Sequence, residues 1–329
     1  MSYSPLPSKM GYSGSTLVYS NNPESIETSH IGLLRNTGCY TIATTIPKGK
    51  IYNFEYYHAN YSKGPLRIAL ALINDTGSPI QYKISREGIA TGTISSSTTT
   101  TQIASQCNSR FYQSSARWDT IPNGNTYLVA DSGEIQNRVL ANGKVEITPI
   151  NGNLKARIVF FDPSNRVQSE ASTFSRVGDE GKSRTTALFR YNHRSISLNL
   201  NANKNKSFLL FPANSIGNWK TFNAGEYPQS ESDAIAGIDG LGTQKSGFNT
   251  KWLCLGNYAL VYDLNLSNCA NRKIEFSKAD KGKGIVMARA NNGTWYAKSV
   301  PFVYEASSTT LLQLILTGGN SGDVVMTII

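Results

Sequence analysis

Apolar and polar residues alternate with a period of two over much of this chain. The longest such row occupies residues 258–266, where every second residue is Tyr or Leu and Asp263 and Asn265 lie between them. Similar rows occupy residues 66–73 and 196–201. Alternation of this kind predicts strands with one buried and one solvated face, which is typical of antiparallel sheets.

Turn sequences separate these rows at intervals of about ten residues, a spacing that favours sandwiches or barrels. Asn-Gly occurs at Asn123, Asn142, Asn151 and Asn292, and it fits two-residue hairpin turns because both of its residues tolerate a positive φ. Helical patterns are scarce, and the best is a short one at residues 230–238. The sequence therefore predicts an all-β protein of two antiparallel, jelly-roll-like sandwiches in tandem, with few short helices.

The length of 329 residues fits about two domains. Residues 170–184 (EASTFSRVGDEGKSR) are polar and lack apolar alternation, so we expect a linker there. The predicted organisation is an N-terminal arm at residues 1–17, a sandwich at 18–169, the linker, and a second sandwich at 185–329.

A stretch without charge, TGTISSSTTTTQIASQ, occupies residues 91–106. It has three interpretations. It is a long surface hairpin or loop, an arm that adds a strand to a neighbouring subunit, or the membrane-inserting hairpin of a β-pore-forming toxin. The third is weakened because only Ile94 and Ile103 would supply a strongly apolar, lipid-facing strip.

Charged residues make up 16% of the chain, and Lys+Arg exceed Asp+Glu by 32 to 22, which gives a formal net charge of +10. The lysines of residues 201–206 and 278–283 lie in turn-like stretches without interleaved aromatics, so the pattern does not favour nucleic-acid binding. Attraction to anionic wall or spore-surface polymers remains an alternative to simple solvated loops. We expect the Tyr cluster at residues 52–61 to lie in a core or an interface rather than to form a sugar platform.

The four cysteines are Cys39, Cys107, Cys254 and Cys269. No two of them have the spacing of a redox or zinc motif. If each sandwich holds two, the natural disulfides are 39–107 and 254–269, and Cys39 or Cys107 is also a candidate inter-subunit thiol. Four free thiols are the alternative, which suits a reducing compartment.

No signal peptide is recognisable at the N-terminus and no apolar run is long enough for a transmembrane helix. We expect synthesis in the cytoplasm, followed by assembly at a spore surface or cell envelope through a mother cell or lysis. Motifs of hydrolases, metalloproteases and nucleotide-binding proteins are missing. We expect hydrogen-bonded structural roles for His58 and His193, and the sequence predicts no catalytic residue, metal or cofactor.

Several segments together resemble surface-type proteins of spore-forming Gram-positive bacteria, often found beside copper-amine-oxidase N-terminal-like stalk domains. They are residues 19–24 (YSNNPE), 56–60 (YYHAN), 66–75 (LRIALALIND), 83–90 (KISREGIA), 186–189 (TALF) and 256–259 (GNYA). The resemblance covers nearly the whole chain and implies a two-domain β protein of the envelope or spore surface, with no assigned activity. We recognise no signal peptide or stalk domain in these residues, so we expect a mother-cell or lysis route rather than simple secretion.

We therefore expect a non-enzymatic structural protein that self-assembles through strand edges into an S-layer-like array or filament. The candidate assembly residues lie in the N-terminal arm and the Thr-rich stretch, and they are Ser4, Tyr12, Thr91, Thr93, Thr98 and Thr100. The expected partner is the protein itself, and anionic cell-wall or spore-surface polymers are a further candidate partner. A carbohydrate- or wall-binding module and a β-pore-forming toxin are the alternatives.

Overall fold

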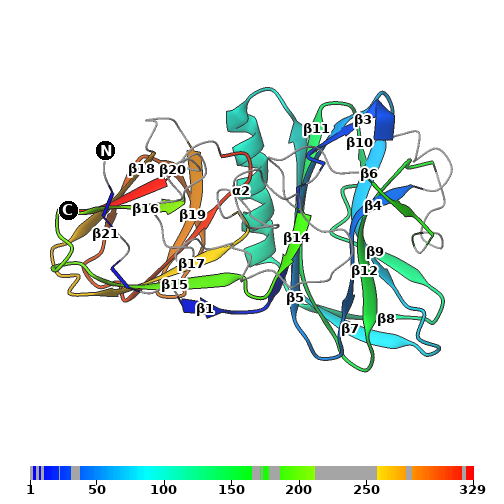
Figure 1. The fold of residues 1–329 in the computed structure, drawn as a ribbon, viewed down its shortest axis with the longest axis horizontal. Helices are drawn as coiled ribbons and strands as arrows, with labels where there is room; N and C mark the ends of the chain where they lie inside the picture. The colour runs from blue at the N-terminus through cyan, green and yellow to red at the C-terminus, as the bar shows by residue number, and fades with distance from the viewer. Residues whose placement is uncertain are drawn as a thin grey trace, which may run out of the picture.

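The computed structural model describes residues 3–4, 7–8, 11–21, 23–30, 38–164, 171, 173–177, 186–211, 258–278, 284–320 and 324–329. Their strands form two lobes, each made of two sheets packed on a buried core. One helix, α2 (Ser97–Gln113), stands between the lobes (Figure 1).

The first lobe has an inner sheet, which α2 covers, and an outer sheet. In order across the inner sheet the strands are β14 (Thr186–Phe189), β2 (Thr16–Ser20), β5 (Tyr52–Tyr61), β11 (Val139–Pro149), β7 (Ile80–Thr93) and β8 (Arg117–Ile121), with β3 (Ser25–Glu27) also on β5. The outer sheet has the order β10 (Glu134–Ile135), β6 (Leu66–Ile73), β12 (Leu154–Phe161), β4 (Cys39–Ile46) and β13 (Ser175–Arg176), with β9 (Thr126–Val129) also on β6. Their apolar faces meet in one core, which includes Phe54, Leu70 and Ile158.

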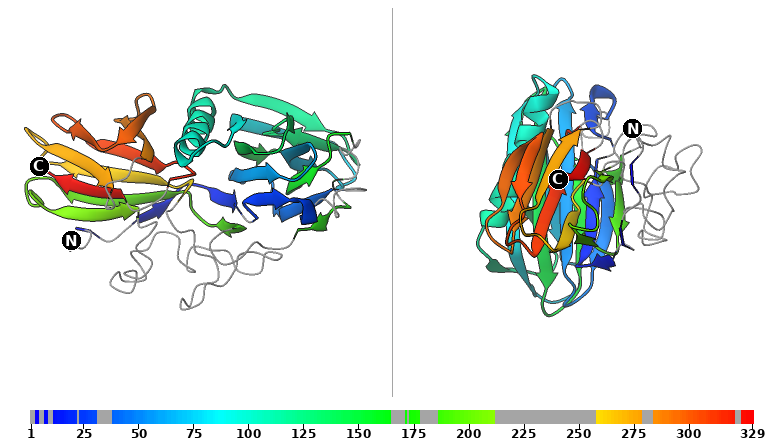
Figure 2. Two further views of the ribbon diagram at one scale, coloured as in Figure 1. Left: turned by 90° about the horizontal axis from the view of Figure 1, so that it is seen from above. Right: turned by 90° about the vertical axis from the view of Figure 1, so that its left-hand side faces the viewer.

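The second lobe has a facing sheet, which is turned toward α2, and a far sheet (Figure 2). The facing sheet has the order β1 (Gly11–Ser13), β15 (His193–Asn199), β17 (Val261–Ser267), β22 (Leu311–Leu316), β19 (Gly284–Ala290) and β20 (Tyr296–Val300). The far sheet has the order β16 (Ser207–Phe211), β23 (Val324–Ile328), β18 (Lys273–Lys278) and β21 (Phe302–Glu305). The alternating Tyr and Leu residues predicted from the sequence fill the core between them.

This arrangement confirms the predicted all-β, sandwich-like fold class. Most neighbouring strands are antiparallel, but β2 and β3 lie parallel to β5, β13 lies parallel to β4, and β15 lies parallel to β17. The expected domain boundaries stay a prediction. The strand at residues 186–189, which we assigned to the second sandwich, pairs with β2 in the first lobe. The predicted short helix at residues 230–238 lies outside the described residues.

The Thr-rich stretch is not a loop, a donated strand or a membrane hairpin. Thr91 and Thr93 end β7 and pair with β11, whereas Thr98 and Thr100 lie in the first turns of α2. The Ser96 side chain caps the helix by accepting a hydrogen bond from the backbone N–H of Thr99. The buried residues of the helix are Thr101, Ile103, Ala104, Ser105, Cys107, Asn108 and Phe111. Because Ser and Thr have low helix propensity, burial between two sheets decides this conformation.

The N-terminal segment pairs within its own chain. Strand β1, which contains Tyr12, lies antiparallel to β15, and the Ser4 backbone N–H donates to the Ser207 carbonyl at 2.8 Å. The Arg194 guanidinium lies 4.7 Å from the centre of the Tyr12 ring. The prediction that this arm is free to pair with a neighbouring subunit is therefore wrong for the segment around Ser4 and Tyr12.

The predicted disulfide between Cys39 and Cys107 is also wrong. Both are free thiols with fully buried side chains, one in the outer sheet and one in α2. Burial raises the pKa of the Cys39 thiol to about 12, which keeps it protonated. Neither thiol can therefore serve as an inter-subunit link in this conformation. Cys269 is free and partly exposed, and Cys254 lies outside the described residues.

Gly88 sets the distance between α2 and the inner sheet. A Cβ atom at this position would lie 2.3 Å from the Cys107 carbonyl oxygen and 2.4 Å from the Phe111 backbone nitrogen. These are backbone atoms of the helix, so a side chain cannot be accommodated by a rotamer change. The missing side chain of Gly88 lets the helix lie directly on β7.

We expect Gly88→Ala to destabilise the protein by about 1–3 kcal/mol, because the added methyl forces α2 away from β7. Gly64→Ala is the matched control, since a Cβ at Gly64 meets nothing within 4 Å. Urea unfolding followed by circular dichroism measures both variants. Equal midpoints for the two would contradict the close packing at Gly88.

Candidate functional site

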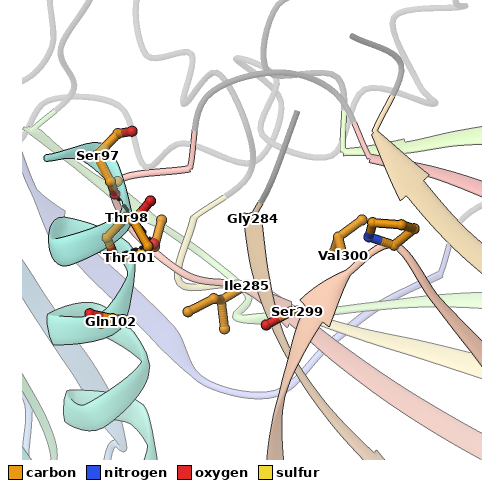
Figure 3. A pocket seen from close by; sticks show the side chains of 10 residues that line it. Ser97, Thr98, Thr101, Gln102, Gly284, Ile285, Ser299 and Val300 are labelled. Atoms are coloured by element: carbon orange, nitrogen blue, oxygen red, sulfur yellow. Dashed lines mark hydrogen bonds between the residues drawn. The ribbon is translucent and has the colours of Figure 1, made fainter. Parts of the chain in front are cut away.

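A pocket of about 550 Å³ lies between the N-terminal half of α2 and the second lobe (Figure 3). The helix side carries hydroxyl and carboxamide groups from Ser97, Thr98, Thr101 and Gln102. The opposite wall comes from β19, β20 and the turns that follow β20 and β22, and its residues are Gly284, Ile285, Ser299, Val300, Pro301 and Gly319. None of these side chains is ionisable, so the pocket suits an uncharged polar group better than an ion.

The polar side chains in this pocket differ in their burial and in their hydrogen bonds to the rest of the protein. Thr101 is buried, and its hydroxyl donates to the Thr98 carbonyl at 2.8 Å. Gln102 and Ser299 are exposed, one on each wall. Figure 3 places these two on opposite sides of the pocket, one on α2 and one on β20. A bound molecule can therefore reach Gln102 from the first lobe and Ser299 from the second, and Ser97 and Thr98 on the helix are exposed as well.

Aromatic and apolar contacts fix the two walls of the pocket to each other. The Tyr112 ring at the end of α2 stacks on Trp295 with 4.6 Å between ring centres. Trp295 in turn belongs to a small buried cluster with Val261, Met287 and Ile315 on the facing sheet. Gly319 has a φ of +74°, and a Cβ there would lie 2.7 Å from the Tyr57 hydroxyl, so this turn rests closely on the first lobe.

A row of polar side chains crosses the same face of the facing sheet. His193 Nδ1 lies 2.8 Å from Asp263, whose other carboxylate oxygen accepts a hydrogen bond of 2.5 Å from Gln313. Arg289 donates to Gln313 and lies 4.8 Å from the centre of the Trp295 ring. Asp263, Gln313 and Arg289 are direct neighbours on β17, β22 and β19. The side chains of this row supply one another with hydrogen-bond partners where the two lobes meet. A hydrogen-bonded structural role is what we expected for His193.

His58 is hydrogen-bonded and buried, as predicted. Its Nδ1 lies 2.5 Å from the Pro23 carbonyl, so this nitrogen carries the proton, and Nε2 accepts from the Ser20 hydroxyl at 2.9 Å. Ser20 also bonds to Thr41 at 2.7 Å. A Ser–His pair can activate a nucleophile, but neither side chain here has exposed surface. The Ser20–His58 pair therefore joins β2 and β5 of the inner sheet, and the bond to Thr41 reaches β4 of the outer sheet. The pair is not reachable by a substrate.

The remaining predicted residues are spread over the structure. Tyr52, Tyr56 and Tyr57 are buried, which confirms the expected core role for three of the clustered tyrosines. Lys206 lies at the end of the turn after β15 and donates to Asn203 at 3.2 Å, whereas residues 279–283 lie outside the described part. The sequence did not single out Gln102, Ser299 or Trp295 as site residues, because α2 and the lobe contact that unite them were not foreseen.

Among the described residues, no group of three or more His, Cys, Asp or Glu side chains is placed to hold a metal ion. In the same part of the chain, no helix is long and apolar enough to cross a membrane.

We expect the buried His58 to make the protein less stable as the pH is lowered. Burial lowers the pKa of His58 from 6.5 to about 3. The unfolded chain therefore takes up a proton between these values while the folded protein does not, so stability is full above pH 6.5 and declines below it. The slope is about 1.4 kcal/mol per pH unit within this window. Thermal unfolding from pH 7 to pH 4.5, compared with His58→Gln, measures the difference. If stability depends on pH equally in the two proteins, the lowered pKa of His58 is not the cause of the destabilisation.

No protein-family model and no curated protein matches this chain. A solved vicilin from Capsicum annuum is 8% identical, covers 80% of this chain and 72% of its own, and has a TM-score of 0.11. An oxalate decarboxylase from Bacillus subtilis is 9% identical, covers 90% of this chain and 74% of its own, and has a TM-score of 0.13. Structural similarity with TM-scores this low supports no conclusion about the fold or the activity of this chain.

Proposed function

We propose that this protein is a non-enzymatic structural component that associates with copies of itself through open strand edges, at a spore or cell surface. The observation that carries the proposal is a pair of edges on different lobes that no strand of the described residues covers, and both present exposed aromatic or apolar side chains. An open edge offers unpaired backbone groups to another strand.

The first edge is β8, which pairs only with β7 among the described strands. Its Trp118 is 57% exposed, too much for a core residue, and Lys83 lies 5.6 Å from the ring centre. The Thr120 backbone N–H donates to the Asp119 side chain rather than to β7, at 2.7 Å. This N–H, and by the strand's alternation that of Trp118, therefore points away from the sheet.

The second edge runs along β20 and β21, which follow each other directly around Pro301. β20 is the last strand of the facing sheet and β21 is the last strand of the far sheet. Tyr296 on β20 is 58% exposed and Val303 on β21 is 52% exposed. One stretch of chain thus forms one edge of each sheet in the second lobe, and Pro301 occupies an edge position that proline tolerates.

The two edges differ in sequence and belong to different lobes. A contact between β8 of one molecule and β20–β21 of the next is therefore head-to-tail, and such contacts form open arrays unless a rotation closes them. Charged residues are only 16% of the chain, which limits repulsion between copies despite the net charge of +10. These features support assembly into a layer or filament.

We expect Thr120→Pro and Val303→Lys each to reduce assembly strongly. The first variant removes an outward backbone donor without removing a bond to β7, and the second places a charge in the apolar contact. Sedimentation velocity over rising protein concentration and negative-stain microscopy measure the assembly.

Ile51→Lys is the matched control, because Ile51 is 45% exposed but lies outside every strand. It should assemble as the parent does. Discrete monomers of the parent protein at all concentrations would overturn the proposal.

A second function, binding of a neutral carbohydrate, is favoured by the uncharged pocket between the lobes. Hydroxyl and carboxamide groups can hydrogen-bond sugar hydroxyls, and Ile285, Val300 and Pro301 offer an apolar surface to a sugar face. The pocket lacks an aromatic platform among its lining residues, so this function takes second place.

Gln102→Ala should then weaken retention on an immobilised neutral polysaccharide such as chitin, because it removes an exposed carboxamide from the pocket. A loss of about tenfold in affinity, corresponding to roughly 1.4 kcal/mol, is the expected size for a hydrogen bond in a neutral site. Gln136→Ala, remote from the pocket, is the control. Equal retention of all three proteins would exclude the pocket as a carbohydrate site.

A further inference from the structure

Three reactive side chains meet in the interior of the first lobe, away from the pocket and the strand edges. Lys144 on β11 has its Nζ atom 2.9 Å from Glu55 Oε2 on β5 and 3.1 Å from Asn108 Oδ1 on α2. The Lys144 and Glu55 side chains are 3% and 2% exposed, and Asn108 has no exposed surface. An amine, a carboxamide and a carboxylate are thus held together without contact to solvent.

The surrounding aromatic rings separate this cluster from water. Lys144 Nζ lies 5.1 Å from the centre of the Phe111 ring and 5.8 Å from that of Tyr112. Glu55 Oε2 receives no hydrogen bond of good geometry despite its short distance to Lys144. A buried ion pair with an incompletely bonded carboxylate is costly to maintain, and replacing it with neutral groups relieves that cost.

The fold brings these groups together through one row of the inner sheet. Glu55 and Lys144 are direct partners on β5 and β11, and Gly88 on β7 is the next residue in the same row. Because Gly88 has no side chain, α2 lies against the sheet there, and Asn108 is one residue after Cys107, whose carbonyl faces Gly88. The close approach of the helix is what places the carboxamide within reach of the amine.

The resting charges follow from the same contacts. Burial on its own lowers the pKa of Lys144, but Glu55, followed by Tyr112, raises it overall, so the pair rests as ammonium and carboxylate. In a dry site a short proton transfer from Lys144 to Glu55 converts this pair into a neutral amine and a neutral acid. The amine then lies 3.1 Å from Asn108 Oδ1, the oxygen bonded to the carbon that it would attack, and holding two reacting groups this close speeds intramolecular reactions.

We propose that Lys144 and Asn108 form an intramolecular isopeptide bond, with Glu55 as the catalytic acid and base. Glu55 takes one proton from the Lys144 ammonium, and Nζ attacks the Asn108 Cγ atom. Glu55 passes that proton to Nδ2 and takes a second one from Nζ as the bond between Cγ and Nδ2 breaks. One C–N bond forms, one breaks, ammonia leaves, and Glu55 ends protonated, with no change of oxidation state.

The bond would join α2 covalently to the central strand of the inner sheet. The helix forms one wall of the pocket and carries the Tyr112–Trp295 stack, so the link would hold the lobe contact in place. A permanent internal link suits a protein with a structural role outside the protection of the cell. The inference itself rests on the cluster geometry and does not depend on the proposed self-association.

The test is mass spectrometry of the folded full-length protein. The intact mass should be lower than the sequence mass by one ammonia molecule. Trypsin should then release peptide 87–110 linked to peptide 139–155, uncleaved after Lys144, because a lysine in an amide bond is not a trypsin site. The linked peptide decides the question, since a succinimide at Asn142-Gly143 would also release ammonia.

Glu55→Gln keeps the size of the side chain but removes the base, and it should give the full sequence mass and no linked peptide. Lys273→Arg is the control, because Lys273 lies 2.7 Å from Glu305 in an exposed pair and should leave the link intact. Circular dichroism confirms that each variant is folded. If the folded parent protein has the full mass and is cleaved after Lys144, the proposal is wrong, whatever the variants show.

Discussion

The close approach of α2 to the inner sheet at Gly88 is the constraint on which much of this structure depends. At that point the helix backbone occupies the space that a side chain would take. The approach buries Ile103, Cys107 and Phe111 against β7 and β11, and it brings Asn108 to Lys144. Since the opposite side of the same helix contacts β19 and β20, one packing contact controls both the interior of the first lobe and its junction with the second.

The junction between the lobes combines aromatic stacking with a row of polar side chains that are hydrogen-bonded to one another. Tyr112 on Trp295 supplies directional contact and apolar burial. The row from His193 to Arg289 pairs the polar side chains of the facing sheet with one another. The chain also crosses between lobes twice, because β1 and β2 pair with β15 and β14 respectively. The side-chain contacts and the two chain crossings together hold the two sandwiches against each other, although no sheet extends through both.

The two proposals place function at different depths of the molecule. The proposed association would use the rims, where Trp118 and Tyr296 are exposed and backbone groups of β8 point outward. The proposed isopeptide bond would form in the interior, where Lys144 and Glu55 are almost fully buried. Both positions reflect the same property of sheets, which is that central strands are covered and saturated while edge strands are not.

The sequence by itself determined the all-β class, the strands around residues 66–73 and 258–266, and the core roles of Tyr52, Tyr56 and Tyr57, whereas Tyr61 of the same cluster is exposed. These features follow from local alternation, which the sheet preserves because each strand has one face in the core. It did not determine α2, the pairing of the N-terminal segment with β15, the free state of Cys39 and Cys107, or the meeting of Lys144 with Asn108. A Thr-rich stretch has no strong local preference for helix, and side chains far apart in the sequence meet only when sheet register and helix packing are set. Only the tertiary structure decided these features, because each depends on which surfaces bury one another.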